Sequence, residues 1–145
     1  MVELAELPDS ELAAILAVAV PAAIEANPDG AGEIVASDYT IADSLGSVSG
    51  ESVTFPGNET PLSRGVRDAI STAVSPGSAV FVPADLTKAM LLLGTPAVAD
   101  DSVIVTYEQR CGGDPDALCG SGGAFRMELG VDGWQVSEVL SGWIS

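Results

Sequence analysis

The residue types that could do chemistry gather in one short stretch, CGGDPDALCG, at residues 111–120. It contains both cysteines of the chain, Cys111 and Cys119, and two aspartates, Asp114 and Asp116. Three kinds of chemistry suit these side chains: a structural disulfide, a reactive thiol pair, or a cation bound by carboxylates. The spacing of the residues helps to separate these alternatives.

A disulfide between Cys111 and Cys119 agrees best with the spacing. The glycines, aspartates and proline between the cysteines favour turns, and each cysteine stands at or near the end of a segment with strand character. Pairing of those two strands would bring the ends of the loop together, as a disulfide requires. Closing so short a loop stabilises a fold by about 2.6 kcal/mol in the chain-entropy model. Catalytic dithiols, by contrast, usually stand two residues apart at a helix N-terminus.

A calcium site formed by Asp114 and Asp116 is the alternative for the same loop. Two alternating carboxylates supply hard oxygen ligands, whereas two thiolates without histidine make an incomplete zinc site. The loop lacks the later glutamate of an EF-hand, and Asp-Pro-Asp is also an ordinary turn sequence. Apart from calcium, the sequence predicts no cofactor.

The chain contains no histidine, which excludes the catalytic triads and metal sites that depend on an imidazole. Acid–base chemistry would then depend on carboxylates in apolar strands, namely Asp38, Glu108, Glu128 and Glu138. A carboxylate that faces an apolar core could act as a general acid. Strand alternation instead predicts that Glu108 and Glu128 face water, so no catalytic residue is assigned.

Charge restricts the partners of the protein. Five basic residues against 21 acidic residues give the chain a net charge of −16. Nucleic-acid binding needs lysine and arginine to neutralise phosphates, and an anionic membrane surface would repel the chain. The acidity is typical of three cases: a halophile protein, an acidic secreted or periplasmic protein, and a surface complementary to a basic partner.

No segment predicts membrane insertion or an attached signal peptide. The longest apolar run, at residues 12–24, has 13 residues and includes a proline, whereas a transmembrane helix needs about 20 apolar residues. Glu3 and Glu6 precede this run, where a signal peptide carries positive charge. If the protein is exported, we expect a signal that is absent from this sequence.

The first two thirds of the chain predict two helices and several short strands. One helix begins near Asp9, and Pro21 kinks or ends it. The second helix, over 60–74, takes Thr60 as its cap and Pro61 as its first residue. The other patterns predict strands at 33–42, 51–56 and 79–83, the last one buried, and a short helix or turn at 85–93.

The last third predicts three antiparallel strands, at 102–111, 123–129 and 134–145. The first two are joined through the cysteine loop, and GVDG at 130–133 is a hairpin turn between the others. Residues 1–145 are therefore expected to form a single α+β domain. In it, an N-terminal helix and a second helix flank a mainly antiparallel sheet that ends in a β-meander.

Three further side chains are candidates for a protein interface. Trp143, near the chain end, suits an interface better than Trp134, which follows a turn and suits the core. Arg64 and Arg67 stand one helical turn apart on the second helix, where two guanidinium groups could hold a carboxylate.

The segments RDAIS…AVFVP and VIVTYEQRC…LCGSGGAFRMELGVDGWQVSEVLSGWIS together resemble small uncharacterised exported bacterial proteins. The shared pattern is a cysteine-bounded loop, a glycine-rich step, an aromatic strand, Asp-Gly-Trp-x-Val and a Trp-Ile-Ser ending. It covers the chain from Arg67 to Ser145. The resemblance implies export and a disulfide between Cys111 and Cys119, and it transfers no catalytic residue. The loop between the cysteines is longer and more acidic here, which leaves a local ligand role open.

The sequence therefore predicts a non-enzymatic exported module, periplasmic or extracellular, that binds a basic protein or serves as a subunit of an assembly. One alternative is a carboxylate-dependent hydrolase or isomerase with a cone-shaped pocket. Another is a calcium-stabilised domain. The cytoplasm of a halophile is the alternative to export.

Overall fold

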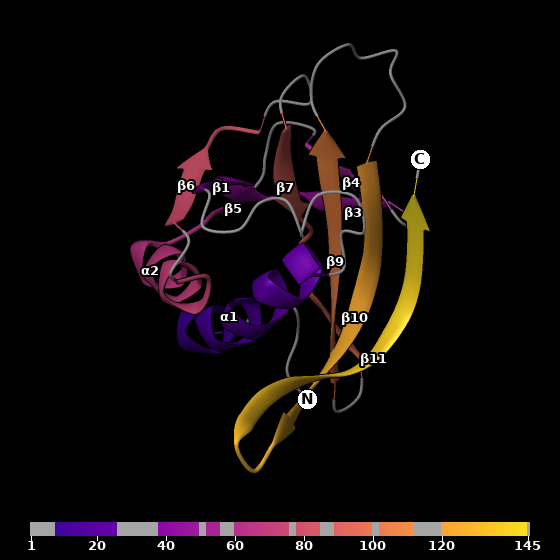
Figure 1. Cartoon of the computed structure of the whole chain (residues 1–145). Helices are drawn as coiled ribbons and strands as arrows, with labels where there is room; N and C mark the ends of the chain where they lie inside the picture. The colour runs from indigo at the N-terminus through magenta and orange to yellow at the C-terminus, as the bar shows by residue number, and fades with distance from the viewer. Residues whose placement is uncertain are drawn as a thin grey trace.

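The computed structural model describes residues 8–25, 38–49, 52–55, 60–75, 78–84, 89–99, 102–111 and 120–144. Two helices in these residues, α1 (Asp9–Glu25) and α2 (Arg64–Ala73), pack against each other and against one face of a mixed sheet. Figure 1 shows the two helices side by side, with the long C-terminal strands beyond α1. The predicted α+β class is confirmed.

The strands of the described residues have these bounds: β1 (Asp38–Ala42), β2 (Ser44–Leu45), β3 (Ser47–Ser49), β4 (Ser52–Thr54), β5 (Thr60–Pro61), β6 (Ser78–Val82), β7 (Ala89–Leu93), β8 (Ala97–Ala99), β9 (Ser102–Cys111), β10 (Gly120–Gly130) and β11 (Gly133–Ile144). The main sheet has the order β11-β10-β9-β7-β1-β6, and β8 also pairs with β9. The predicted meander is β9–β10–β11, which is antiparallel throughout, whereas β1 pairs in parallel with both β6 and β7.

The second helix begins at Arg64 rather than at the predicted Pro61. Ser63 is its cap, because the Ser63 Oγ accepts a hydrogen bond from the Val66 amide at 3.2 Å. The same hydroxyl donates to Asp9 Oδ2 at 2.7 Å and so joins the starts of α1 and α2. Thr60 and Pro61 pair with β2 instead.

Pro21 does not end the first helix, since α1 continues to Glu25. Val20 and Ala23, on either side of the proline, are fully buried in the core between α2 and the sheet. A proline inside a helix costs about 3 kcal/mol. Burial of the apolar residues around Pro21 offsets this cost, because each fully buried valine contributes about 1.5–3 kcal/mol.

The segment 85–93, predicted as a short helix or turn, contains strand β7, so that prediction was wrong. Every β7 residue from Met90 to Leu93 is buried, because the strand lies in the middle of the sheet with both faces covered. A strand buried on both faces shows no alternation of polar and apolar residues, and its sequence resembles that of a buried helix. Strand β6, predicted to be buried, is instead an edge strand on which Val80 is 42% exposed.

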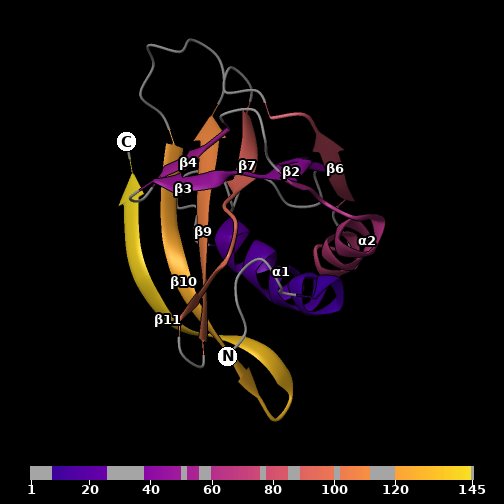
Figure 2. The same ribbon diagram turned by 180° about the vertical axis from the view of Figure 1, so that it is seen from behind.

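The β3–β4 hairpin covers the face of the sheet opposite the helices. Figure 2 shows these two strands crossing β9 and β10 on the viewer's side. Met90 and Leu92 point to that face and pack with Ala42 of β1 and Val53 of β4 in a second apolar cluster. The sheet is therefore a middle layer between the helices and the hairpin.

Two glycines allow the hairpin to lie close to the sheet. A Cβ on Gly94 would overlap Val48 Cγ2, and a Cβ on Gly46 would lie 2.6 Å from the Thr54 carbonyl oxygen. Gly46 and Gly94 form an isolated parallel bridge beside β7. Any side chain at either position would therefore push the hairpin outward.

In the part of the chain that the structure describes, no helix combines the length and the apolar character that crossing a bilayer requires.

We expect Gly94→Ala to lower the free energy of unfolding by about 1–3 kcal/mol, because the added methyl must displace Val48 or the backbone of the hairpin. Gly65→Ala is the matched control. A Cβ there has 3.6 Å of space to Asp9 Oδ2, and alanine favours a helix over glycine by about 0.5–1 kcal/mol. Urea unfolding of both variants measures the difference. A stabilising effect at both positions would contradict the close approach of the hairpin.

Candidate functional site

The cysteine loop lies mostly outside the described residues. Cys111 ends β9, whereas Cys119, Asp114 and Asp116 are not among the residues that the structure describes. The strands on either side pair as the sequence predicts, with Arg110 opposite Gly120. Each cysteine is one residue from this pair, about 3.8 Å along the chain. The disulfide and the calcium site both stay predictions.

The structure does not bring the predicted interface residues together. Arg64 and Arg67 are exposed on α2, which lies beside β6 at one edge of the sheet. Trp143 belongs to β11, the opposite edge strand, where it pairs with Gly122 of β10. Trp134, assigned to the core, packs against it, and its Nε1 donates a hydrogen bond to Glu11 Oε2 at 2.7 Å. The contact ties the start of β11 to the first turn of α1.

Glu108 is a buried acid near the middle of the sheet. The residue is 3% exposed, and no other acidic residue is buried among those whose side chains the structure describes. It lies on β9 between Leu92 of β7 and Gly122 of β10. Its Oε1 accepts a hydrogen bond from the backbone amide of Val53 at 3.3 Å. Glu108 therefore ties β4 of the hairpin to the sheet.

The prediction that Glu108 faces water was wrong, and the covering hairpin is the reason. Alternation along β9 does separate two faces, because Val103 and Val105 belong to the core beneath the helices. Thr106 and Glu108 point to the other face, where both are buried. Alternation of apolar and polar residues separates the two faces of a strand, but it does not show which element covers the more polar face. The glycine opposite Glu108, Gly122, was the available sign of close packing.

The position of Glu108 limits its chemistry. Burying a carboxylate is unfavourable by several kcal/mol unless hydrogen bonds replace its water, and the Val53 amide provides one such bond. A catalytic acid must also meet a substrate, whereas β4 covers Glu108. The geometry therefore supports a role in holding the hairpin on the sheet.

Tyr107 lies on the opposite, helix-covered face of β9. Its ring stacks on Phe125 of β10, with 5.0 Å between ring centroids and 20° between ring planes. Burial raises the pKa of the Tyr107 hydroxyl above its ordinary value of 10.0. The unfolded chain ionises first as pH rises, so this tyrosine destabilises the fold only above about pH 10. Tyr107 is thus a neutral core residue at physiological pH.

The other acids of the meander face solvent. Glu128 is exposed, as predicted, and Glu138 is exposed on β11. The Arg126 guanidinium on β10 forms an ion pair with Glu138, with 2.7 Å between Nη1 and Oε1. The one arginine in the described part of the hairpin is therefore already paired.

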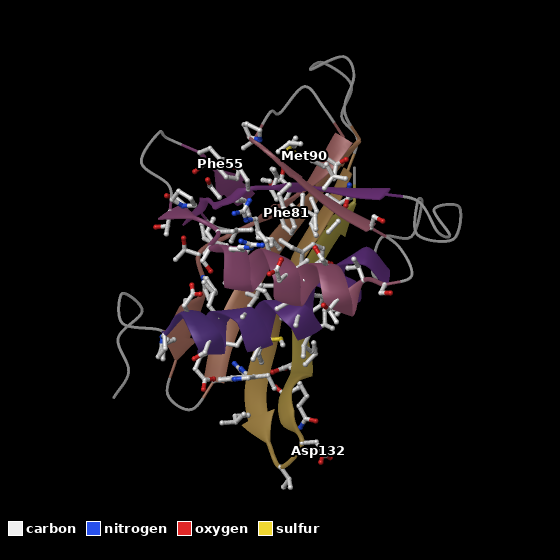
Figure 3. The ribbon with its side chains drawn as sticks, turned by 90° about the vertical axis from the view of Figure 1, so that its left-hand side faces the viewer. Phe55, Phe81, Met90 and Asp132 are labelled. Atoms are coloured by element: carbon white, nitrogen blue, oxygen red, sulfur yellow. The ribbon has the colours of Figure 1, made fainter. Side chains whose placement is uncertain are left out.

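Exposed apolar side chains concentrate on the β10–β11 hairpin. Four of the six large apolar side chains that are exposed in the described residues lie there: Leu129, Val131, Val139 and Leu140. We call these four residues the apolar hairpin surface. The hairpin projects past α1, and Figure 3 shows Asp132 at its tip, at the far end of the molecule from Phe55 and Met90.

Sequence reasoning predicted both strands of this hairpin but missed the surface. Leu129 is 61% exposed and Val139 is 65% exposed, although apolar residues in a strand pattern suggest a core. The adjacent pair Val139-Leu140 was the available sign, because neighbouring residues of a regular strand point to opposite faces. One of the two was therefore bound to leave the core face.

Searches of protein-family models, of curated proteins and of solved structures find no match to this chain. The resemblance to small exported bacterial proteins stays an expectation based on the residues that carry it.

Removing the Glu108 carboxylate should loosen the hairpin. We expect Glu108→Ala to lower the free energy of unfolding by about 2–4 kcal/mol, because the Val53 amide loses its acceptor and a cavity remains. Glu108→Gln keeps an oxygen for that amide and should lose about half as much. The exposed Glu128→Ala is the control and should change stability by less than about 0.5 kcal/mol.

Denaturant unfolding ranks these three variants, and amide hydrogen exchange at Val53 reports the hairpin directly. Exchange at Val53 should be faster in Glu108→Ala than in Glu128→Ala. Equal exchange rates in the two variants would show that the carboxylate does not hold the hairpin.

Proposed function

We propose that this chain is a non-enzymatic binding module, or a subunit of a larger assembly, whose partner is a basic protein. The observation that carries the proposal is the apolar hairpin surface, exposed on a chain with a net charge of −16. Contiguous exposed apolar patches mark interaction sites, and these four side chains lie along one hairpin. The negative charge favours a partner of the opposite sign and speeds the encounter with it.

The burial of Glu108 beneath β4 supports a binding function over a catalytic one. An enzyme that depends on a carboxylate needs that group in a cleft where a substrate can reach it. Glu108 is the buried acid of the described residues, and it lies beneath β4 with its Oε1 bonded to a backbone amide. The hydrolase or isomerase alternative therefore has less support than the binding module.

We further propose that the protein works outside the cytoplasm with Cys111 and Cys119 bridged. The sequence resemblance supports this placement, and so does the pairing of Arg110 with Gly120 next to the two cysteines. Disulfides form and persist in oxidising compartments. The calcium-stabilised domain and the cytoplasm of a halophile are the alternatives.

The bridge predicts the thiol content of protein made through an export route. Alkylation under denaturing conditions should add no mass before reduction and two alkyl groups after it, because both sulfurs are in the disulfide. Intact mass spectrometry measures this. Two alkyl groups before reduction would contradict the bridge and favour the cytoplasm of a halophile.

The partner class can be tested with an unstructured cationic peptide, Lys-Val-Lys-Thr-Lys-Val-Lys, and a matched peptide with glutamate in place of every lysine. We expect the full chain to bind the lysine peptide and not the glutamate peptide at low salt. Raising the salt from about 0.05 M to about 0.5 M should weaken binding at least tenfold, because screening shortens the range of the attraction.

Fluorescence anisotropy of the labelled peptides gives the Kd at each salt concentration. An affinity that does not change with salt would show that the acidic surface is not the determinant. Failure of the lysine peptide to bind at low salt would contradict a basic partner.

A further inference from the structure

The two edge strands of the main sheet differ in the features that hinder pairing with a further strand. β6 has five residues, and Pro83 follows it directly. β11 has 12 residues and forms the other edge, and Figures 1 and 2 show no described element beside its outer side. Edge strands are usually short, or they carry charged side chains, proline or β-bulges that hinder further pairing. β11 contains no lysine, arginine or proline.

Two bulges interrupt this edge and leave regular strand on either side of them, at residues 133–136 and 141–144. Phe125 pairs with Val139 and Ala124 pairs with Ser141, so Leu140 is an extra residue in β11. Ser137 is a second extra residue, and its hydroxyl donates to the Arg126 carbonyl oxygen at 3.1 Å. Bulges bend a strand and re-aim its side chains. The bulge at Leu140 leaves Val139 and Leu140 exposed together in the middle of the edge.

Charge decides what can pair with this edge. Glu128 and Asp132 are exposed on the hairpin, and the guanidinium of Arg126 is paired with Glu138. A second copy that paired through the same edge would bring its own Glu128 and Asp132 there, on a chain that again has a net charge of −16. Like charges repel at strand-pairing distance, whereas an extended cationic segment is attracted.

We propose that the outer edge of β11 receives an extended segment of a cationic protein, which pairs with the regular stretches of β11 that flank Val139 and Leu140. Main-chain hydrogen bonds along β11 supply affinity, as in other cases of strand addition. Val139 and Leu140 contact alternate side chains of the segment. The exposed Glu128 and Asp132 attract the lysines and arginines of the segment. This inference rests on the proposed function and names the surface and the binding mode.

The test uses the full chain and the lysine peptide in two forms. The second form carries N-methyl groups on alternate residues, which keep its charge but remove the donors that strand addition needs. Val139→Lys/Leu140→Lys places two charges on the β11 edge. Ser78→Lys/Val80→Lys adds the same two charges on β6, where both positions are exposed.

We expect N-methylation to weaken binding at least tenfold. The β11 variant should lose at least tenfold in affinity, and the β6 variant should lose less than about threefold, since both change the net charge equally. Unfolding midpoints within about 2 °C of the parent chain show that both variants fold, as expected for exposed positions.

The outcomes separate the two proposals. Equal losses in the β6 and β11 variants, or equal binding of the N-methylated peptide, would overturn strand addition at β11 and leave the acidic binding module standing. Failure of the lysine peptide to bind at low salt would overturn both. A dimer of the free chain in sedimentation, abolished only in the β11 variant, would make a second copy the occupant and contradict a cationic partner.

Discussion

Both faces of the central strands are covered, and the rest of the fold depends on this constraint. The helices exclude water from one face of β7 and β9, and the β3–β4 hairpin excludes it from the other. A polar side chain between these layers must find its hydrogen bonds inside the protein. Glu108 finds one at the Val53 amide, and Gly94 leaves the space in which the hairpin can approach.

Local patterns predicted the elements whose structure is decided locally. The strands β9, β10 and β11 were predicted from the alternation of apolar and polar residues and from the GVDG turn. Both signals lie within the strands themselves or in the turn that joins two of them. The cap of α2 could not be chosen in this way, since Thr60 and Ser63 both have cap-forming hydroxyls. Asp9, 54 residues away, bonds to Ser63 in the folded chain.

The features of the candidate site depend on contacts that are still more distant in sequence. Glu108 is buried because Val53, 55 residues earlier, lies over it, and no pattern around Glu108 identifies that neighbour. The order of strands in the sheet is likewise a long-range property, so alternation in β11 could not show that no other described strand pairs with its outer side. The two bulges then change which residues face outward, which a regular period of two cannot describe.

The charge of the chain and the exposed edge are connected. A long edge without lysine or proline is prone to pair with another copy of itself wherever bulges do not interrupt it. At physiological salt the Debye length is about 8 Å, whereas paired strands lie about 4.8 Å apart. Two chains that each carry a net charge of −16 would therefore repel one another before their edges pair.

This repulsion acts on acidic neighbours alone. A cationic segment at the same distance is attracted by the same charges. The main-chain groups of β11 are available to it, and β11 contains no lysine that would repel it. Lysines on the edge strand would instead weaken the repulsion between two acidic copies. The same lysines would repel a cationic partner. An acidic chain with an open edge therefore combines resistance to self-association with access for a partner of the opposite sign.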